Sequence, residues 1–107
     1  MQKMAGKSRN TRKIERFVRT LKEQMPELSA RYKVKSLAVF GSYVRGEQTP
    51  RSDLDVLVEY SETPDIFQFM ELERHLAQVL GVHVDLVSRK ALKGRIGRRI
   101  ENEIIPV

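Results

Sequence analysis

The residues best suited to chemistry lie in segment 39–60, where a Gly-Ser pair is followed by two aspartates. Gly41 and Ser42 come directly after an apolar run, and ten further residues separate them from Asp53 and Asp55. An apolar strand has little structural use for two acids, and a glycine at the end of a strand lets a ligand approach the backbone closely. We therefore expect the chemistry of the chain in this segment.

The two aspartates suit a metal site. They stand two positions apart in the alternating segment 52–59, which predicts a half-buried strand. On a strand, both carboxylates point the same way, with Cα atoms about 6.6 Å apart. Like charges held together are costly unless a cation lies between them, and Mg²⁺ prefers oxygen ligands that it shares with substrate phosphates. Asp85, in the alternating segment 82–87, could supply a third carboxylate to a two-metal site.

The Gly-Ser pair suits a phosphate site. A helix that begins at Ser42 would offer backbone amides and the positive end of its dipole to an anion, and the Ser42 hydroxyl would add a donor. Together with the aspartates, this indicates phosphoryl or nucleotidyl transfer from a nucleoside triphosphate by positioning and charge neutralisation. Each part alone is a weak signal, because Gly-Ser is most often a turn and Asp-x-Asp a solvated strand end. The ordered set is specific.

Hydrophobic periodicity predicts the elements that would position these residues. Apolar residues at three- and four-residue steps predict an amphipathic helix from about residue 11 to residue 24. Pro26 should interrupt it and leave a second short helix over 26–31. We further expect strands at 34–40, 52–59 and 82–87, a short helix at 42–45 ending at Gly46, a long helix at 65–80 ending at Gly81, and a short helix near 95–103.

The predicted fold class is α+β, a small mixed sheet with helices on one face. The helix at 65–80 would pack on the sheet through a wide apolar face that includes Ile66, Phe67 and Met70. The other sheet face would carry the three aspartates and lie open as a groove.

The length of 107 residues predicts one domain, with residues 1–10 as a mobile basic arm and residues 11–107 as the folded unit. There is no cysteine, and hence no disulfide framework or cysteine-based zinc site. The sequence has no apolar run near 18 residues and no secretory signal pattern, so we expect a cytoplasmic protein without a membrane span.

The net charge of +6 is unevenly distributed. Residues 1–22 carry eight basic groups and one acidic group, residues 23–85 carry six and eleven, and residues 86–107 carry six and two. Basic ends around an acidic centre suit a polyanionic substrate held at a metal-neutralised site. Solvated termini that keep the protein soluble are an equally good interpretation.

The combined pattern resembles the minimal nucleotidyltransferases, the MNT or MntA-like group of the DNA polymerase β superfamily. The hallmark of that group, hydrophobic-Gly-Ser-x10-Asp-x-Asp, is matched by Phe40, Gly41, Ser42, Asp53 and Asp55. The wider pattern FGSYxRGE followed by SDLDVLV is matched too, and the later strand HVDLV contributes a third acid. The resemblance covers about residues 13–105.

The resemblance implies roles for these residues. Asp53 and Asp55 would hold two Mg²⁺ ions, and Asp85 would complete one metal site and help activate the incoming hydroxyl. Gly41 and Ser42 would bind the β- and γ-phosphates of ATP. Arg45 would also reach the triphosphate, or else be a solvent-exposed helix charge.

The resemblance also implies an acceptor. Small MNT proteins resemble antitoxins that transfer AMP from ATP to a tyrosine of a HEPN-domain (HepT-type) toxin, and this is the leading hypothesis for function and partner. Three alternatives stay open: an antitoxin that acts by contact alone, a nucleotidyltransferase that modifies a small molecule, and nucleic-acid binding through the basic residues of segment 3–22. The acceptor, the base preference and the oligomeric state are not specified by any motif.

Overall fold

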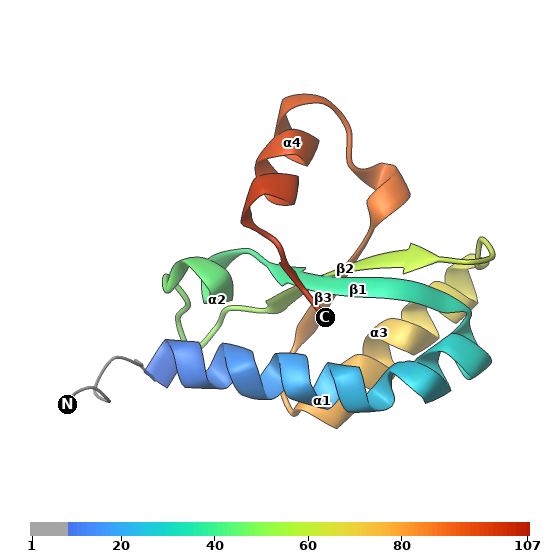
Figure 1. The fold of residues 1–107 in the computed structure, drawn as a ribbon, viewed down its shortest axis with the longest axis horizontal. Coiled ribbons are helices and arrows are strands. Elements are labelled where there is room, and N and C mark those ends of the chain that lie inside the picture. Colours follow the sequence, from blue (N-terminus) through green and yellow to red (C-terminus); the bar gives the residue numbers. More distant parts are fainter. Residues whose placement is uncertain (1–8) are drawn as a thin grey trace.

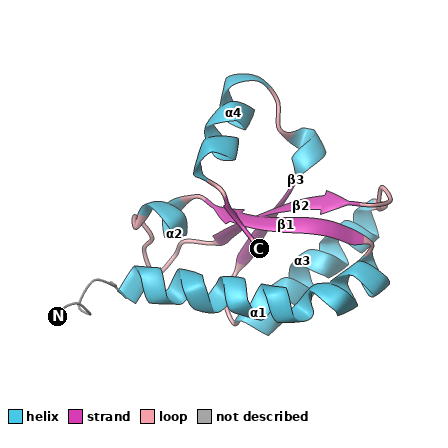
Figure 2. Cartoon of the chain, in the orientation of Figure 1, coloured by secondary structure: helices cyan, strands magenta, loops and turns pink. Residues whose placement is uncertain are grey.

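The computed structural model describes residues 9–107. Most of the predicted arm lies outside this range, whereas Arg9 and Asn10 already belong to the first helix. The elements run in the order α1 (Arg9–Tyr32), β1 (Val34–Phe40), α2 (Ser42–Arg45), β2 (Leu54–Tyr60), α3 (Ile66–Leu80), β3 (Val84–Ser88), the 3-10 helix η2 (Arg89–Ala91), α4 (Gly94–Glu103) and β4 (Ile105–Pro106). Figure 1 shows the order along the chain, and Figure 2 separates helices from strands.

Four strands form one mixed sheet in the order β3-β2-β1-β4. β1 pairs antiparallel with β2 and with β4, whereas β2 pairs parallel with β3. The parallel pair needs a crossover connection, which α3 supplies between β2 and β3. The predicted α+β class with a small mixed sheet is confirmed, although the short edge strand β4 was not predicted.

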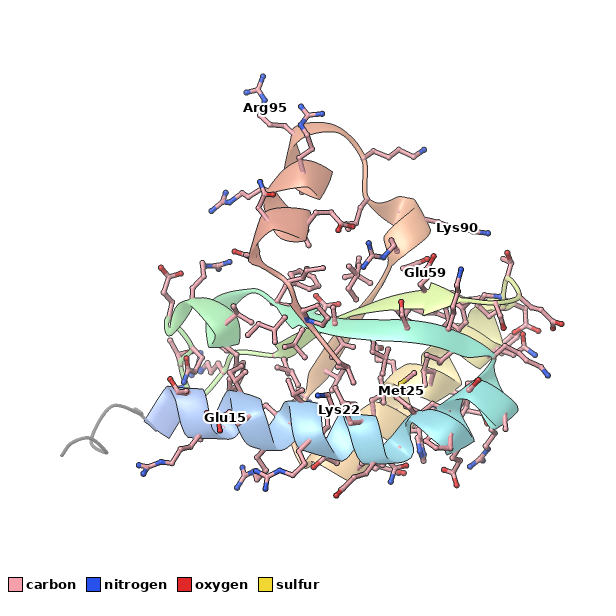
Figure 3. All side chains as sticks on the ribbon, viewed as in Figure 1. Glu15, Lys22, Met25, Glu59, Lys90 and Arg95 are labelled. Atoms are coloured by element: carbon pink, nitrogen blue, oxygen red, sulfur yellow. The ribbon has the colours of Figure 1, made fainter. Side chains whose placement is uncertain are left out.

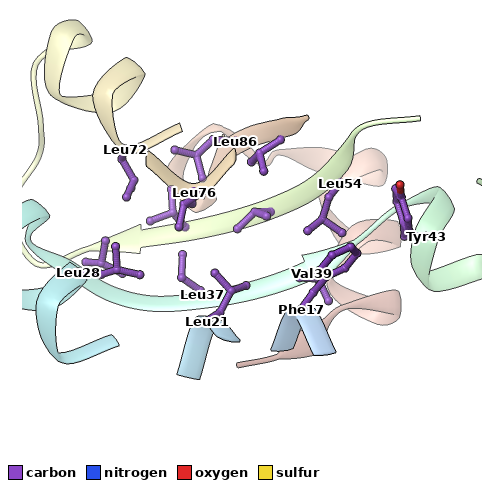
Figure 4. Close-up of a cluster of buried hydrophobic side chains, with 14 of the residues drawn as sticks. Phe17, Leu21, Leu28, Leu37, Val39, Tyr43, Leu54, Leu72, Leu76 and Leu86 are labelled. Carbon is purple, nitrogen blue, oxygen red and sulfur yellow. The ribbon is translucent and has the colours of Figure 1, made fainter. Parts of the chain in front are cut away.

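The main core lies between the sheet and the two long helices, α1 and α3, which lie on the same side of it (Figure 1). Side chains from all these elements meet there (Figure 4), and the fully buried ones include Phe17, Leu21, Leu28, Leu54, Val56, Val58, Leu72 and Leu76. The alternating pattern of β2 thus places Leu54, Val56 and Val58 on this face and Asp55 and Leu57 on the other.

The opposite face is less open than the sequence predicted. Ala38, Phe40 and Leu57 form a second apolar cluster there, and side chains of the C-terminal segment, including Ile100 and Ile104, pack against them. In Figure 1, α4 stands on this side of the sheet. The predicted open groove is therefore partly covered by α4, the helix that the sequence pattern did not assign to either face of the sheet.

Helix α1 is continuous through Pro26, so the predicted break was wrong. A proline inside a helix removes one hydrogen bond and costs about 3 kcal/mol. Leu21 and Leu28, one on each side of the proline, are both fully buried. Their burial in the main core, worth about 1.5–3 kcal/mol each, offsets that cost and holds both halves of the helix on the sheet.

Helix α3 begins and ends with well-formed caps. Asp65 and Gln68 form a capping box at its start, and Gly81 ends it in the left-handed conformation. Its first turn does not pack as predicted, since Ile66, Phe67 and Met70 are 63%, 77% and 49% exposed. The later turns of α3 bury Leu72 and Leu76 fully, and Phe69 packs against the core partly buried. No helix in the described range is both long enough and apolar enough to span a membrane.

Candidate active site

Strand pairing brings the predicted site residues together. Phe40, the last residue of β1, is the register partner of Asp55 near the start of β2. Asp55 is in turn the register partner of Asp85 in the parallel strand β3. The Gly-Ser turn therefore lies beside the first of two adjacent carboxylates, although Asp85 comes 30 positions later in the sequence than Asp55.

Gly41 approaches Asp55 so closely that only glycine fits. Its backbone lies at φ 85° and ψ −155°, a region that is essentially restricted to glycine. A Cβ atom at this position would collide with a carboxylate oxygen of Asp55 and lie 2.8 Å from its Cγ. The turn after β1 is thus shaped so that the backbone passes directly over the carboxylate.

The Asp55 carboxyl group is held in an environment that disfavours its charge. Partial burial, followed by repulsion from Asp85, raises the pKa of Asp55 to about 6, and a hydrogen bond to Asp85 and the charge of Asp53 act in the same direction. Arg45 opposes these effects only in part. The site therefore holds an excess of negative charge that a cation would relieve.

Asp53 and two neighbours of the motif residues, Ser52 and Tyr43, lie away from this pair of carboxylates. Asp53 precedes β2 and is exposed, so β2 begins two residues later than predicted. The Ser52 hydroxyl accepts a hydrogen bond from the Thr49 amide at 2.8 Å and so closes the loop before β2. Tyr43 is buried edge-on against Phe17, with ring centroids 5.8 Å apart, so it packs in the core and does not face a ligand.

The short helix α2 positions Arg45, as predicted, and ends at Gly46 in the left-handed conformation. With only four residues, α2 has little dipole of its own, so the predicted contribution of a helix dipole to anion binding is small. The cationic group of the turn is Arg45. Its Nε donates to Glu47 at 2.8 Å and its Nη1 donates to both carboxylate oxygens of Glu103, at 3.0 and 3.2 Å.

Glu103 also belongs to the site, although the sequence did not predict this. It ends α4, and its Oε1 also accepts a hydrogen bond of 3.1 Å from the Gly41 amide, 62 positions away in the chain. The only sequence signal was an acid in a basic tail, since Glu101 and Glu103 are the two acids of residues 86–107. Glu101 instead pairs with Arg89 at 2.7 Å, so the two acids serve different parts of the fold.

A cavity of about 370 Å³ lies where these groups meet, between the end of β1, α2 and α4. The residues that line it include Gly41, Arg45, Asp55, Ile96, Arg99 and Glu103. A somewhat larger cavity, about 430 Å³, lies between α1, Val44 and Ile105, but none of the predicted site residues line it. The cavity beside Asp55 is therefore the candidate active site.

The carboxylate pair fits a hard divalent cation in its chemistry. Asp55 and Asp85 are neighbouring oxygen donors whose mutual repulsion a cation would remove. In the range from residue 9 onward, however, no three His, Cys, Asp or Glu side chains are grouped closely enough to hold a metal ion. Asp53 would have to turn toward the pair to complete a three-carboxylate site.

Comparison with known proteins agrees with this geometry. The model of the nucleotidyltransferase domain family matches residues 18–107. A Methanocaldococcus jannaschii protein, named as a proposed protein adenylyltransferase, is 50% identical over 88 residues. The match covers 81% of this chain and 90% of that protein. The protein adenylyltransferase MntA of Thermococcus cleftensis is 40% identical over 94 residues, or 88% of this chain and 95% of the relative.

Solved structures show the same fold. A structure described as a proposed minimal nucleotidyltransferase has a TM-score of 0.70 at 36% identity and covers 86% of this chain and 94% of its own. A toxin-antitoxin structure with AMP-PNP has a TM-score of 0.63 at 27% identity, covering 78% and 69%. The chain is a nucleotidyltransferase with the polymerase β-type fold and belongs to the nucleotidyltransferase domain family, within its minimal, MNT-like group.

Proposed function

We propose that this protein is a metal-dependent adenylyltransferase that moves AMP from ATP to a hydroxyl group of a partner protein, a tyrosine of a HEPN-domain toxin, and so acts as an antitoxin. The observation that carries the proposal is the arrangement of Gly41, Asp55 and Asp85. A backbone turn that only glycine can form passes over one carboxylate, and the register of two parallel strands places a second carboxylate beside it. This arrangement suits a triphosphate bound next to a metal site.

The reaction would be a single displacement at phosphorus. The acceptor hydroxyl oxygen attacks the α-phosphorus of ATP, a new P–O bond forms, the bond to the bridging oxygen of the β-phosphate breaks, and pyrophosphate leaves. The hydroxyl proton must pass to a base, and Asp85, which is exposed on β3 beside Asp55, is the group proposed to accept it. Catalysis otherwise rests on holding the two reactants in line.

Each residue of the proposed site has a distinct task. Gly41 and Ser42 would bind the β- and γ-phosphates, and Arg45 would neutralise part of the triphosphate charge. Mg²⁺ ions held by Asp53, Asp55 and Asp85 would supply charge neutralisation at the reacting phosphate. These carboxylates would also fix the position of the α-phosphate relative to the acceptor.

The acceptor class is supported by relatives, not by a residue of this chain that recognises a partner. Two relatives that align over most of their length carry names that describe protein adenylyltransferases. The 27% identical structure is a toxin-antitoxin with AMP-PNP, an ATP analogue. A protein acceptor, ATP as the donor and an antitoxin role are therefore the proposal that these similarities favour.

The direct test incubates the purified protein with a HEPN-domain protein from the same genome, ATP and Mg²⁺, and measures the intact mass of the partner. We expect one or more AMP additions, with peptide mapping on a tyrosine. The Asp53→Asn, Asp55→Asn double variant should still bind the partner but leave its mass unchanged. Glu71→Gln, an exposed acid on α3, is the matched control and should modify the partner normally.

Other outcomes would favour the alternatives. An unmodified partner, despite ATP binding and a stable complex, would contradict the proposal and favour an antitoxin that acts by contact. AMP transfer to a small molecule without any protein partner would indicate a small-molecule transferase. DNA retention that falls steeply with salt and depends on exposed bases of α1 such as Arg12, Arg16 and Arg19 would indicate nucleic-acid binding.

A further inference from the structure

Glu103 is bound by the site in the way that an anion would be. One of its carboxylate oxygens accepts from the Gly41 amide at 3.1 Å and from Arg45 Nη1 at 3.0 Å, and the second oxygen lies 3.2 Å from the same nitrogen. The Glu103 side chain is 19% exposed and lines the cavity that also contains Asp55. An internal carboxylate thus takes up a backbone donor and a guanidinium donor of the candidate active site.

These donors match those that a phosphate group requires. Phosphate oxygens in proteins are commonly bound by backbone amides and by arginine forks. The proposed function assigns the turn at Gly41 and the side chain of Arg45 to the triphosphate. The same two groups cannot give the same hydrogen bonds to Glu103 and to a phosphate oxygen at once.

The charges around Arg45 also indicate that Glu103 and a phosphate group would compete for this side chain. Hydrogen bonds to Glu47 and then to Glu103 raise the pKa of Arg45, so the guanidinium is fully charged and both of its sides are held by carboxylates. Arg45 also lies near enough to Asp55 in the cavity to lower the pKa of that carboxyl group. While both Glu47 and Glu103 hold the Arg45 guanidinium, its positive charge is largely balanced within the site, so a triphosphate gains most from Arg45 once Glu103 moves away.

We propose that Glu103 occupies a phosphate subsite of the nucleotide site and that the triphosphate displaces its carboxylate on binding. Glu103 is therefore an internal competitor that lowers the affinity for nucleotide. This inference rests on the proposed function, because it takes a nucleoside triphosphate as the ligand. It adds a residue of the C-terminal helix that governs occupancy of the site.

The displacement requires no break in the sheet. Glu103 is the last residue of α4, and the next segment is tied to β1 through the pairs Val39–Ile105 and Ala38–Pro106. Rotation about the side-chain bonds of Glu103 moves its carboxylate into the solvent while Ile100 and Ile104 stay packed on the sheet. The Glu103 side chain is already 19% exposed, so solvent is within its reach. Arg95, near the other end of α4, points away from the sheet and does not block this movement (Figure 3).

The test measures binding by calorimetry, without divalent cations, for the wild-type protein and for Glu103→Ala and Glu103→Gln. The probes are ATP, inorganic tripolyphosphate and adenosine. We expect Glu103→Ala to bind ATP and tripolyphosphate about tenfold more tightly than the wild-type protein does, and Glu103→Gln to change the affinity in the same direction. Adenosine, which has no phosphate, should bind equally to all three proteins.

Two control variants separate the removal of the Glu103 carboxylate from the phosphate subsite from a simple loss of negative charge. Glu47→Gln removes the other carboxylate partner of Arg45 but leaves Glu103 on the Gly41 amide, so its gain in affinity should be less than threefold. Glu101→Gln removes an acid from the same helix that pairs with Arg89 instead, so its affinity should equal that of the wild-type protein. Thermal unfolding of every variant verifies that each one is folded.

The results distinguish this inference from the proposed function. If a folded Glu103→Ala or Glu103→Gln protein binds ATP no more tightly than the wild-type protein, Glu103 positions Arg45 and does not compete, and the inference is overturned while the proposed function stands. An equal gain with Glu47→Gln would also overturn it, because charge alone would then explain the effect. If no folded variant binds ATP even with Mg²⁺ present, both proposals fail.

Discussion

Asp55 of β2 and Asp85 of β3 are register partners in the one parallel pair of the described sheet. Their side chains leave the same face of the sheet, and the charge of Asp85 helps to raise the pKa of Asp55. Because α3 returns the chain in parallel, two acids that are 30 positions apart become neighbours. The pairing places two negative charges side by side, which affects both the stability of the fold and its affinity for cations.

Replacing Asp55 with Asn should stabilise the protein at neutral and alkaline pH. The folded-state pKa of Asp55 is raised from 3.8 to about 6. Below pH 3.8 the group is neutral in both states and has no effect. Between pH 3.8 and about 6 the unfolded chain is already ionised while the folded protein keeps the proton, so stability falls across this range, and the loss is complete above it. Allowing for partial exposure, we expect Asp55→Asn to gain on the order of 1–2 kcal/mol at pH 8.

Urea unfolding at pH 4 and pH 8 with EDTA present checks this prediction. The gain should appear at pH 8 and shrink toward zero at pH 4. The control is Glu62→Gln, which replaces an exposed acid and should change stability equally at pH 4 and pH 8. Asp65 is avoided as a control because its side chain caps α3. An Asp55→Asn gain of equal size at both pH values would contradict the assigned cause.

Magnesium should stabilise the wild-type protein through the carboxylates. For a Kd of about 1 mM, 10 mM Mg²⁺ adds about 1.4 kcal/mol, which raises Tm by several degrees in a domain of this size. The shift should vanish in Asp55→Asn and in Asp85→Asn. Thermal scans with and without Mg²⁺ measure it, with equal ionic strength set by NaCl. An undiminished shift in both variants would place the cation elsewhere.

Alanine at Gly41 should cost much more stability than alanine at Gly81. Both glycines have positive φ, 85° and 72°. At Gly81 nothing lies within 4 Å of the added Cβ, so the cost is conformational strain of about 1 kcal/mol. At Gly41 the Cβ would also displace the Asp55 side chain, and we expect a loss of about 3 kcal/mol. Equal losses in urea unfolding would show that the contact with Asp55 is unimportant.

Two phenylalanines should respond very differently to truncation. Phe17 is 2% exposed in the main core, whereas Phe67 is 77% exposed on α3. Phe17→Ala should cost about 3–5 kcal/mol through lost burial and a cavity. Phe67→Ser should change the free energy of unfolding by no more than about 0.5 kcal/mol. A large loss from Phe67→Ser would mean that this side chain is covered in the native protein in solution.

Much of the site followed from local sequence. Gly41-Ser42 and Asp53-x-Asp55 are each close in sequence, and the alternation of segment 52–59 correctly assigned the faces of β2. The bounds of β1 and α2 agree with the predicted ones. These features depend on backbone periodicity and on glycine, both of which act over a few residues.

The errors share a physical cause. The break predicted at Pro26 was wrong because burial of Leu21 and Leu28 depends on the sheet, which lies far along the sequence. The predicted packing of Ile66, Phe67 and Met70 was wrong because an apolar stripe does not say how much of it a partner element covers. Local preference is a weak guide wherever tertiary packing decides.

By itself, the sequence determined which kinds of groups this protein carries: a glycine turn suited to phosphate, paired carboxylates suited to a cation, and the apolar residues of a core. The tertiary structure alone decided which groups meet. The parallel register sets Asp85 beside Asp55, and the return of α4 over the second sheet face brings Glu103 to the amide of Gly41 across 62 positions. Such contacts depend on the path of the whole chain, because no periodic pattern encodes a distance through space.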